Sequence, residues 1–190
     1  MSFTISTSLS WELLAVALGL IYVTLAARHN PWAWVAAFVS TAIYTVIFWY
    51  DALPMQASLN LYYMFIAVYG WYQWRQKKGE AAPIIHRMSG YEHRLFIGTG
   101  IIATLVVGYI LSSFELSQAP YLDTATTLFA MANTWLLLNN RLENWLYWIA
   151  IDTANIVLFT LTEHYSTVLL FATYIILSVY GYLSWRKQLT

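Results

Sequence analysis

Six long windows of this sequence contain no Asp, Glu, Lys or Arg, and this spacing of charges constrains the fold more than any other feature. The windows are residues 13–27, 29–50, 52–74, 95–114, 124–140 and 164–185. A seventh stretch, about 143–162, carries one acidic residue near its middle, Asp152. Because a helix needs about 20 apolar residues to cross a bilayer, we expect an all-α integral membrane protein with seven transmembrane helices.

The composition supports a membrane protein and excludes several other classes. Charged residues make up 9% of the 190 residues and hydrophobic residues 60%, whereas soluble domains contain about 25% charged residues. The chain has no cysteine, which excludes disulfides, thiolate metal sites and a cysteine nucleophile. Nine basic residues balance nine acidic ones, so we expect no basic face for nucleic acid.

The basic residues predict the orientation in the membrane. If the loops alternate between the two sides, all nine Lys and Arg residues fall on the side of the C-terminus. The opposite side carries acidic residues only, namely Glu12, Asp51, Glu115, Asp123 and Glu163. By the positive-inside rule, the C-terminus is expected in the cytoplasm and the N-terminus outside.

The two halves of the chain resemble each other. Residues 68–75 (VYGWYQWR) match residues 179–186 (VYGYLSWR) at an offset of 111. Residues 28–32 (RHNPW) match residues 141–145 (RLENW) at an offset of 113. Chance recurrence of aromatic and basic residues at helix ends is the alternative explanation.

An internal repeat would divide the chain into three parts. We expect two parallel three-helix repeats, in residues 1–75 and 116–190, related by an axis along the membrane normal. The connector and the fourth helix, in residues 76–115, would join them. Three helices plus one connector helix return the second copy to the orientation of the first.

Residues 143–162, the sixth predicted span along the chain, hold the side chains most suited to binding a ligand. Trp145, Trp148, Asp152 and Asn155 are spaced i, i+3, i+7 and i+10, so they share one face of a helix. An acid at mid-bilayer costs a few kcal/mol, so Asp152 is expected to face the protein interior or a wet cavity. Three states stay open for it: protonated, hydrogen-bonded to a neighbouring helix, or available to a cationic ligand.

Other spans offer further polar and aromatic candidates. Asn133, in the fifth span, either contacts a substrate or makes an interhelical hydrogen bond. Tyr63 and Tyr174 are equivalent in the repeat, and Asn60 shares a helix face with Tyr63. Four tryptophans at span ends are expected in the interfacial belt. They are Trp49, Trp71, Trp74 and Trp185.

Several chemistries have no residues to support them. The four histidines lie in or beside loops, and no lysine lies inside a predicted span. A metalloprotease helix, a buried Ser-His pair and a retinal Schiff base are therefore not expected. The sequence has no Walker A motif, which excludes ATP hydrolysis by that route. We expect no enzyme activity, no metal and no cofactor.

Three segments together resemble the PnuC family of vitamin transporters, over nearly the whole chain. They are residues 59–63 (LNLYY), 69–72 (YGWY) and 143–148 (ENWLYW). The resemblance implies a 3+1+3 helix fold similar to that of SWEET sugar transporters, in a bacterial inner membrane. It also implies facilitated diffusion of nicotinamide riboside, thiamine or riboflavin, followed by intracellular phosphorylation that traps the vitamin.

The resemblance also implies where the ligand binds. The family's site lies around a Trp-x-x-x-Asn pattern on the sixth helix, matched here by Trp148 and Asp152, so an acid replaces the amide. Because of this replacement we expect thiamine rather than nicotinamide riboside. The expected substrate-binding residues are Trp148, Asp152, Asn155, Trp145, Asn144, Asn133, Tyr174, Tyr63 and Asn60.

Two other functions would use similar residues. A vitamin-binding subunit of an ATP-driven importer needs partner chains. A SWEET-like sugar carrier stacks its substrate on tryptophan without requiring Asp152. Uptake by the protein alone, without ATP or partners, distinguishes the facilitator from the importer subunit. The expected partners are the vitamin and the lipid bilayer, and a homo-oligomer stays open.

Overall fold

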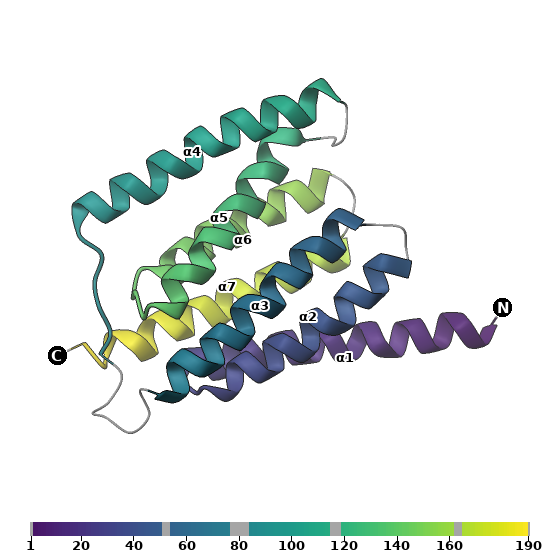
Figure 1. Ribbon diagram of the computed structural model, residues 1–190, viewed down its shortest axis with the longest axis horizontal. Coiled ribbons are helices and arrows are strands. Elements are labelled where there is room, and N and C mark those ends of the chain that lie inside the picture. The colour runs from purple at the N-terminus through teal and green to yellow at the C-terminus, as the bar shows by residue number, and fades with distance from the viewer. Residues whose placement is uncertain (1, 51–53, 77–83, 115–118, 162–164, 190) are drawn as a thin grey trace. The chain divides into compact units, whose positions relative to one another are not determined.

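The computed structural model describes residues 2–50, 54–76, 84–114, 119–161 and 165–189, and within them it contains seven α-helices (Figure 1). The helices are α1 (Ser2–Ala27), α2 (Trp32–Tyr50), α3 (Pro54–Gln76), α4 (Gly90–Ser113), α5 (Pro120–Leu138), α6 (Asn144–Leu161) and α7 (Tyr165–Arg186). Each predicted span falls on a helix of its own. The expected all-α, seven-helix architecture is therefore confirmed.

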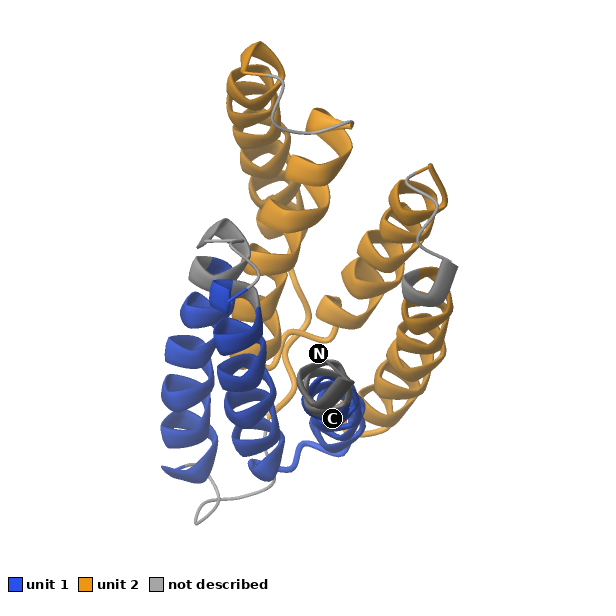
Figure 2. Ribbon diagram, turned by 90° about the vertical axis from the view of Figure 1, so that its right-hand side faces the viewer, with its two compact units in different colours: residues 1–83 blue, residues 84–190 orange. Residues whose placement is uncertain are grey.

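The chain forms two compact units, Met1–Pro83 and Ile84–Thr190 (Figure 2). In the first unit, α2 packs against both α1 and α3. In the second unit, α5 packs against α4 and α6, and α6 also packs against α7. By its packing, α4 belongs with the three helices that follow it. The predicted division of the chain into residues 1–75, 76–115 and 116–190 stays a prediction.

The helices differ in how apolar they are. Among the described residues, three windows are long and apolar enough to cross a membrane: Ser10–Ala27, Gly90–Ser113 and Val168–Arg186. Helices α5 and α6 interrupt their apolar sequences with Asn133, Asp152 and Asn155, whose side chains are all buried. These two helices therefore turn polar groups toward protein rather than lipid.

The turn that follows the first helix of each repeat has the same backbone geometry. His29 and Asn140, 111 residues apart, have φ values of 54° and 56°. Each amide donates to the carbonyl three residues earlier, at 2.9 and 3.1 Å. The next amide donates to the carbonyl five residues before it, at 2.9 and 3.0 Å, which is the Schellman arrangement of a helix C-terminus. The turn thus repeats at an offset of 111, and the offset of 113 is wrong.

A tryptophan-glycine-tryptophan contact is also repeated at this offset. Its members are Trp34, Gly70 and Trp74 in the first unit, and Trp145, Gly181 and Trp185 in the second. One indole lies on the glycine and meets the other indole edge-on, with centroids 5.2 Å apart in the first unit and 5.5 Å in the second. This shared core shows that the two halves have one scaffold.

The shared core corrects one prediction about the tryptophans. Trp74 and Trp185 are 3% and 0% exposed, so they do not lie in the interfacial belt. Their rings pack inward because the glycine one turn earlier leaves space for the partner indole. Trp49, by contrast, is 70% exposed, as expected of a residue at the membrane interface.

Candidate substrate-binding site

The polar stripe on α6 faces the protein interior. Asp152 and Asn155 are 3% and 9% exposed, and Trp148, one turn before Asp152, is half-buried. Other faces of α6 carry exposed side chains, such as Leu146 and Val157. The helical spacing in the sequence therefore predicted the buried face of α6 correctly.

Asp152 is the chemically distinctive residue of this stripe. Its Oδ2 atom is buried and has no hydrogen-bond partner among the described residues. A buried carboxyl oxygen without a partner is costly, so the position calls for a donor from water or from a ligand. This arrangement suits a site that binds a donor-bearing molecule.

Asn133 and Asn144 lie together at the start of α6, and both are fully buried. The side-chain amide of Asn133 donates to the backbone carbonyl of Asn144 at 2.9 Å. The amide of Asn144 donates to the carbonyl of Arg141 at 2.5 Å. The Oδ1 atoms of both asparagines have no partner in the described part of the chain. Asn133 thus makes the interhelical bond considered from the sequence and keeps a free acceptor.

Trp145 has a clear packing role. It is 1% exposed, lies on Gly181 and meets the edge of Trp185. Trp34 occupies the equivalent place in the first unit, on Gly70. These contacts explain why tryptophan stands at this position, and a contact between Trp145 and substrate stays a prediction.

Helix α7 adds one residue that sequence reasoning did not select. Two ring contacts fix the register of α6 against α7: Trp145 with Trp185, and Phe159 with Phe171. Trp145 and Phe159 on α6 are separated by the same number of residues as Phe171 and Trp185 on α7, and the two pairs follow in opposite order along the chain. The two helices therefore run antiparallel. Asp152, midway between the two rings on α6, lies level with Ser178, midway between the two rings on α7. Ser178 is 2% exposed. Its position one turn after Tyr174 was the available signal.

The remaining predicted residues lie in two different units. Tyr174 is half-buried in the second unit, where its ring meets the edge of Phe171 at 6.0 Å. Tyr63 and Asn60 lie in the first unit, both half-buried, with the rings of Tyr62 and Tyr63 5.5 Å apart. The structure therefore groups Trp148, Asp152, Asn155, Asn133, Asn144, Trp145 and Tyr174 in the second unit.

The repeat separates scaffold residues from site residues. At the offset of 111, the first copy has Ala37, Thr41 and Tyr44 at the positions of Trp148, Asp152 and Asn155. The hydroxyl of Thr41 donates to a carbonyl of its own helix, four residues earlier, at 2.8 Å. The tryptophan-glycine-tryptophan core is common to both copies, whereas the acid and the amide of the polar stripe have no counterparts at the equivalent positions of the first copy.

Seven helices, a tryptophan-glycine-tryptophan core in each half and a buried polar stripe in the second half fit a multi-pass membrane transporter. A family model described as nicotinamide mononucleotide transporter matches residues 9–187. The chain therefore belongs to this family, that of the PnuC vitamin transporters, and it is not an enzyme.

Individual relatives agree with this assignment. The riboflavin/roseoflavin transporter RibM of Streptomyces davaonensis is 26% identical over 143 residues, 73% of this chain and 67% of RibM. The nicotinamide riboside transporter PnuC of Escherichia coli is 20% identical over 185 residues, 83% of this chain and 77% of that protein. A crystal structure of the vitamin B3 transporter PnuC superimposes with a TM-score of 0.76, at 21% identity, and the match covers 98% of this chain and 85% of that one.

Proposed function

We propose that this protein takes up a water-soluble, cationic B vitamin by facilitated diffusion, that phosphorylation inside the cell traps the vitamin, and that the vitamin is thiamine. Membership of the family and the substrates named for its relatives, nicotinamide riboside and riboflavin, support a vitamin of this size. The choice of thiamine rests on Asp152.

The observation that carries the proposal is the buried carboxyl oxygen of Asp152, which has no hydrogen-bond partner among the residues that the structure describes. An ionised carboxylate accepts hydrogen bonds but cannot donate them. Thiamine carries an amino group on its pyrimidine ring and a permanent positive charge on its thiazolium ring, so it supplies both a donor and a countercharge. A charge-assisted hydrogen bond of this kind contributes about 1.5–3 kcal/mol.

Trp148 and the neighbouring amides would complete the site. Trp148 lies one turn from Asp152 and is half-buried, and its indole would stack on a flat ring of the substrate. A cation over a desolvated indole is stabilised by about 2 kcal/mol or more. Asn155 and Asn133 would hydrogen-bond the ring substituents, and Tyr174 would close the site from α7.

Nicotinamide riboside is the second candidate, because a relative with that printed substrate aligns over 83% of this chain. Its pyridinium ring also carries a permanent charge and would stack on Trp148. Its carboxamide gains more from an amide than from an acid at position 152, because an amide both donates and accepts. Charge alone therefore does not separate the two vitamins, whereas the hydrogen-bonding pattern does.

Calorimetric titration of the purified protein with thiamine, nicotinamide riboside, riboflavin and a sugar tests the substrate. We expect thiamine to bind most tightly. Tight binding of nicotinamide riboside or riboflavin with no binding of thiamine would contradict the argument from Asp152 and leave the family assignment intact. Uptake into liposomes without ATP or partner chains would exclude an importer subunit.

The substitution Asp152→Asn tests the role of the carboxylate. We expect thiamine affinity to fall about tenfold or more, corresponding to at least about 1.4 kcal/mol, while the thermal unfolding temperature stays close to that of wild type. The same substitution at Asp123, in the first turn of α5, is the matched control and should leave affinity unchanged. Equal affinities in the two variants would show that the charge of Asp152 does not bind the substrate.

A further inference from the structure

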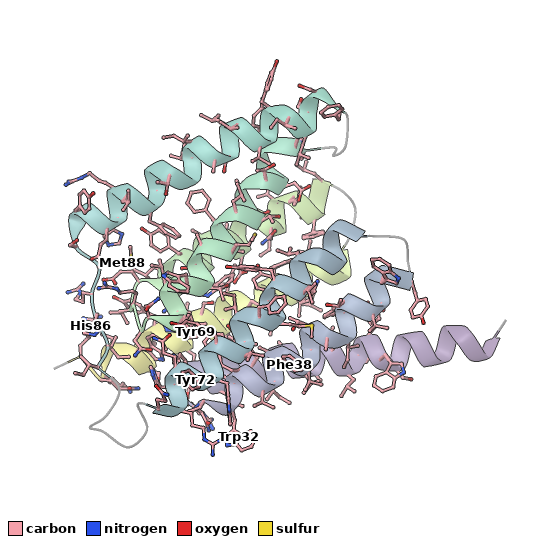
Figure 3. All side chains as sticks on the ribbon, in the orientation of Figure 1. Trp32, Phe38, Tyr69, Tyr72, His86 and Met88 are labelled. Atoms are coloured by element: carbon pink, nitrogen blue, oxygen red, sulfur yellow. The ribbon has the colours of Figure 1, made fainter. Side chains whose placement is uncertain are left out.

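Residues 84–89, which lead into α4, lie along the turn between α5 and α6. The amide of His86 donates to the carbonyl of Asn140 at 3.0 Å, and the amide of Leu142 donates to the carbonyl of His86 at 2.9 Å. His86 and Arg141 thereby form a parallel β-bridge. Figure 3 labels His86 and Met88 on this segment.

The side chain of Glu143 contacts residues 84–89 through two of their members. This carboxylate is only 6% exposed. Its Oε2 accepts from the amide of Met88 at 2.8 Å, and its Oε1 lies 3.5 Å from Nε of Arg87. Ile85 and Met88 are themselves buried, at 5% and 9% exposure. The segment therefore has an apolar underside and a buried ionic anchor.

Further contacts tie the start of α4 to the same place. Arg141 donates to the carbonyl of Arg87 at 3.2 Å and pairs with Glu92 at 2.6 Å. Glu92 also completes a capping box with Ser89 at the beginning of α4. His93, in the first turn of α4, lies 2.6 Å from the hydroxyl of Tyr147 on α6.

The anchor is special to the second copy of the repeat. At the offset of 111, the position of Glu143 is occupied by Trp32 in the first copy. Trp32 is 56% exposed and meets the ring of Trp71 at 5.0 Å. The duplicated scaffold therefore does not require an acid here, which indicates that Glu143 serves the segment before α4.

We infer that residues 84–89 form a strap anchored by Glu143, and that this strap stays closed while the protein transports, so that α4 to α7 move as one body. Opening the strap would leave the buried carboxylate of Glu143 without its donors, which is strongly unfavourable. Glu143 directly precedes α6, the helix that carries Trp148 and Asp152. It is thus a positioning residue for the candidate site.

Cysteine labelling tests the strap directly, because the wild-type chain has no cysteine. A cysteine introduced as Met88→Cys should react slowly with a water-soluble maleimide in liposomes. The control Ile84→Cys, at a position of the same segment that is 65% exposed, should react at least tenfold faster. Equal rates for the two cysteines would show that the strap opens and would overturn the inference.

Substitution of the anchor separates its role from general stability. In the Met88→Cys background, Glu143→Ala should accelerate labelling tenfold or more. Glu143→Gln keeps an acceptor for the Met88 amide and should restore slow labelling to within threefold of the parent. Unchanged labelling in Glu143→Ala, with the protein still folded by thermal unfolding, would remove Glu143 as the anchor.

A cross-link tests whether the strap has to open for transport. Neighbouring parallel strands lie about 4.8 Å apart, within the Cα separations that a disulfide spans, so His86→Cys with Arg141→Cys should cross-link on oxidation. Uptake of thiamine, nicotinamide riboside or riboflavin should stay within twofold of the reduced double variant. A tenfold loss that reduction reverses, or failure to cross-link, would overturn the inference.

The transport measurement rests on the proposed function, whereas the labelling measurements do not. A protein that takes up none of the three vitamins but labels as expected would contradict the proposed function and still support the strap. A protein that transports thiamine but labels rapidly at Met88→Cys would support the proposed function and contradict the strap.

Discussion

Gly181 is one of the two glycines at which the duplicated core is sensitive to change. A methyl group added there would lie 2.6 Å from the indole of Trp145, within a tightly packed contact. We therefore expect Gly181→Ala to lower stability by about 1–3 kcal/mol, the usual effect of overpacking. Thermal unfolding in detergent, followed by tryptophan fluorescence, measures the change.

Gly98 provides the matched control for this substitution. A methyl group added there meets no atom of the described residues within 4 Å, and alanine favours a helix over glycine by up to about 1 kcal/mol. Gly98→Ala should leave the unfolding temperature unchanged or raise it. If Gly181→Ala behaved in the same way, the indole would not be in contact with Gly181.

Individual residues show what a sequence can and cannot predict. The spacing of Asp152 and Asn155 gave the buried face of α6, because helical periodicity fixes which side chains lie on one face. Position near a span end misled the prediction for Trp185, because it indicates the depth of a side chain in the membrane but not the direction in which it points. Spacing along the chain does not place Ser178 against α6, and only the packing of α6 against α7 puts it level with Asp152.

The turns show the same limit at the scale of elements. Matching residues 28–32 with 141–145 by identity gave an offset of 113, whereas the backbone conformation shows 111. The positions that are truly equivalent, His29 and Asn140, differ in residue type and share a positive φ. Conformation of this kind is not readable from identity, because most residue types occupy it only rarely.

The left-handed turn after α5 makes a prediction of its own. Glycine adopts a positive φ without strain, whereas a residue with a Cβ pays roughly 1–2 kcal/mol. We expect Asn140→Gly to keep or raise the thermal stability, and Asn140→Ala to lower it by about 1 kcal/mol. The backbone carbonyl at position 140 accepts from the amide of His86, and neither substitution removes this bond. The two variants therefore differ mainly in backbone strain. Equal unfolding temperatures would contradict this account.

At the scale of the whole molecule, the charge distribution predicts the topology. All nine basic residues fall on one side of a seven-helix arrangement, so that side is expected in the cytoplasm. Reporter fusions at Gln188 and within residues 76–90 should both give a cytoplasmic signal. A periplasmic signal at either position would contradict the arrangement, because one missed or extra span moves the later loops to the other side.

The scarcity of buried charge also predicts the energetics of transport. Accumulation against a gradient needs an energy source, and the chain has no Walker A motif for hydrolysing ATP. Coupling to protons would need a titratable group deep in the membrane, and Asp152 is the acid that the predicted spans place there. If Asp152 serves to bind the vitamin, transport has no coupled ion, and radiolabelled thiamine in liposomes should reach the outside concentration and stop. Accumulation above that level, abolished by a protonophore and by Asp152→Asn, would show instead that Asp152 carries protons.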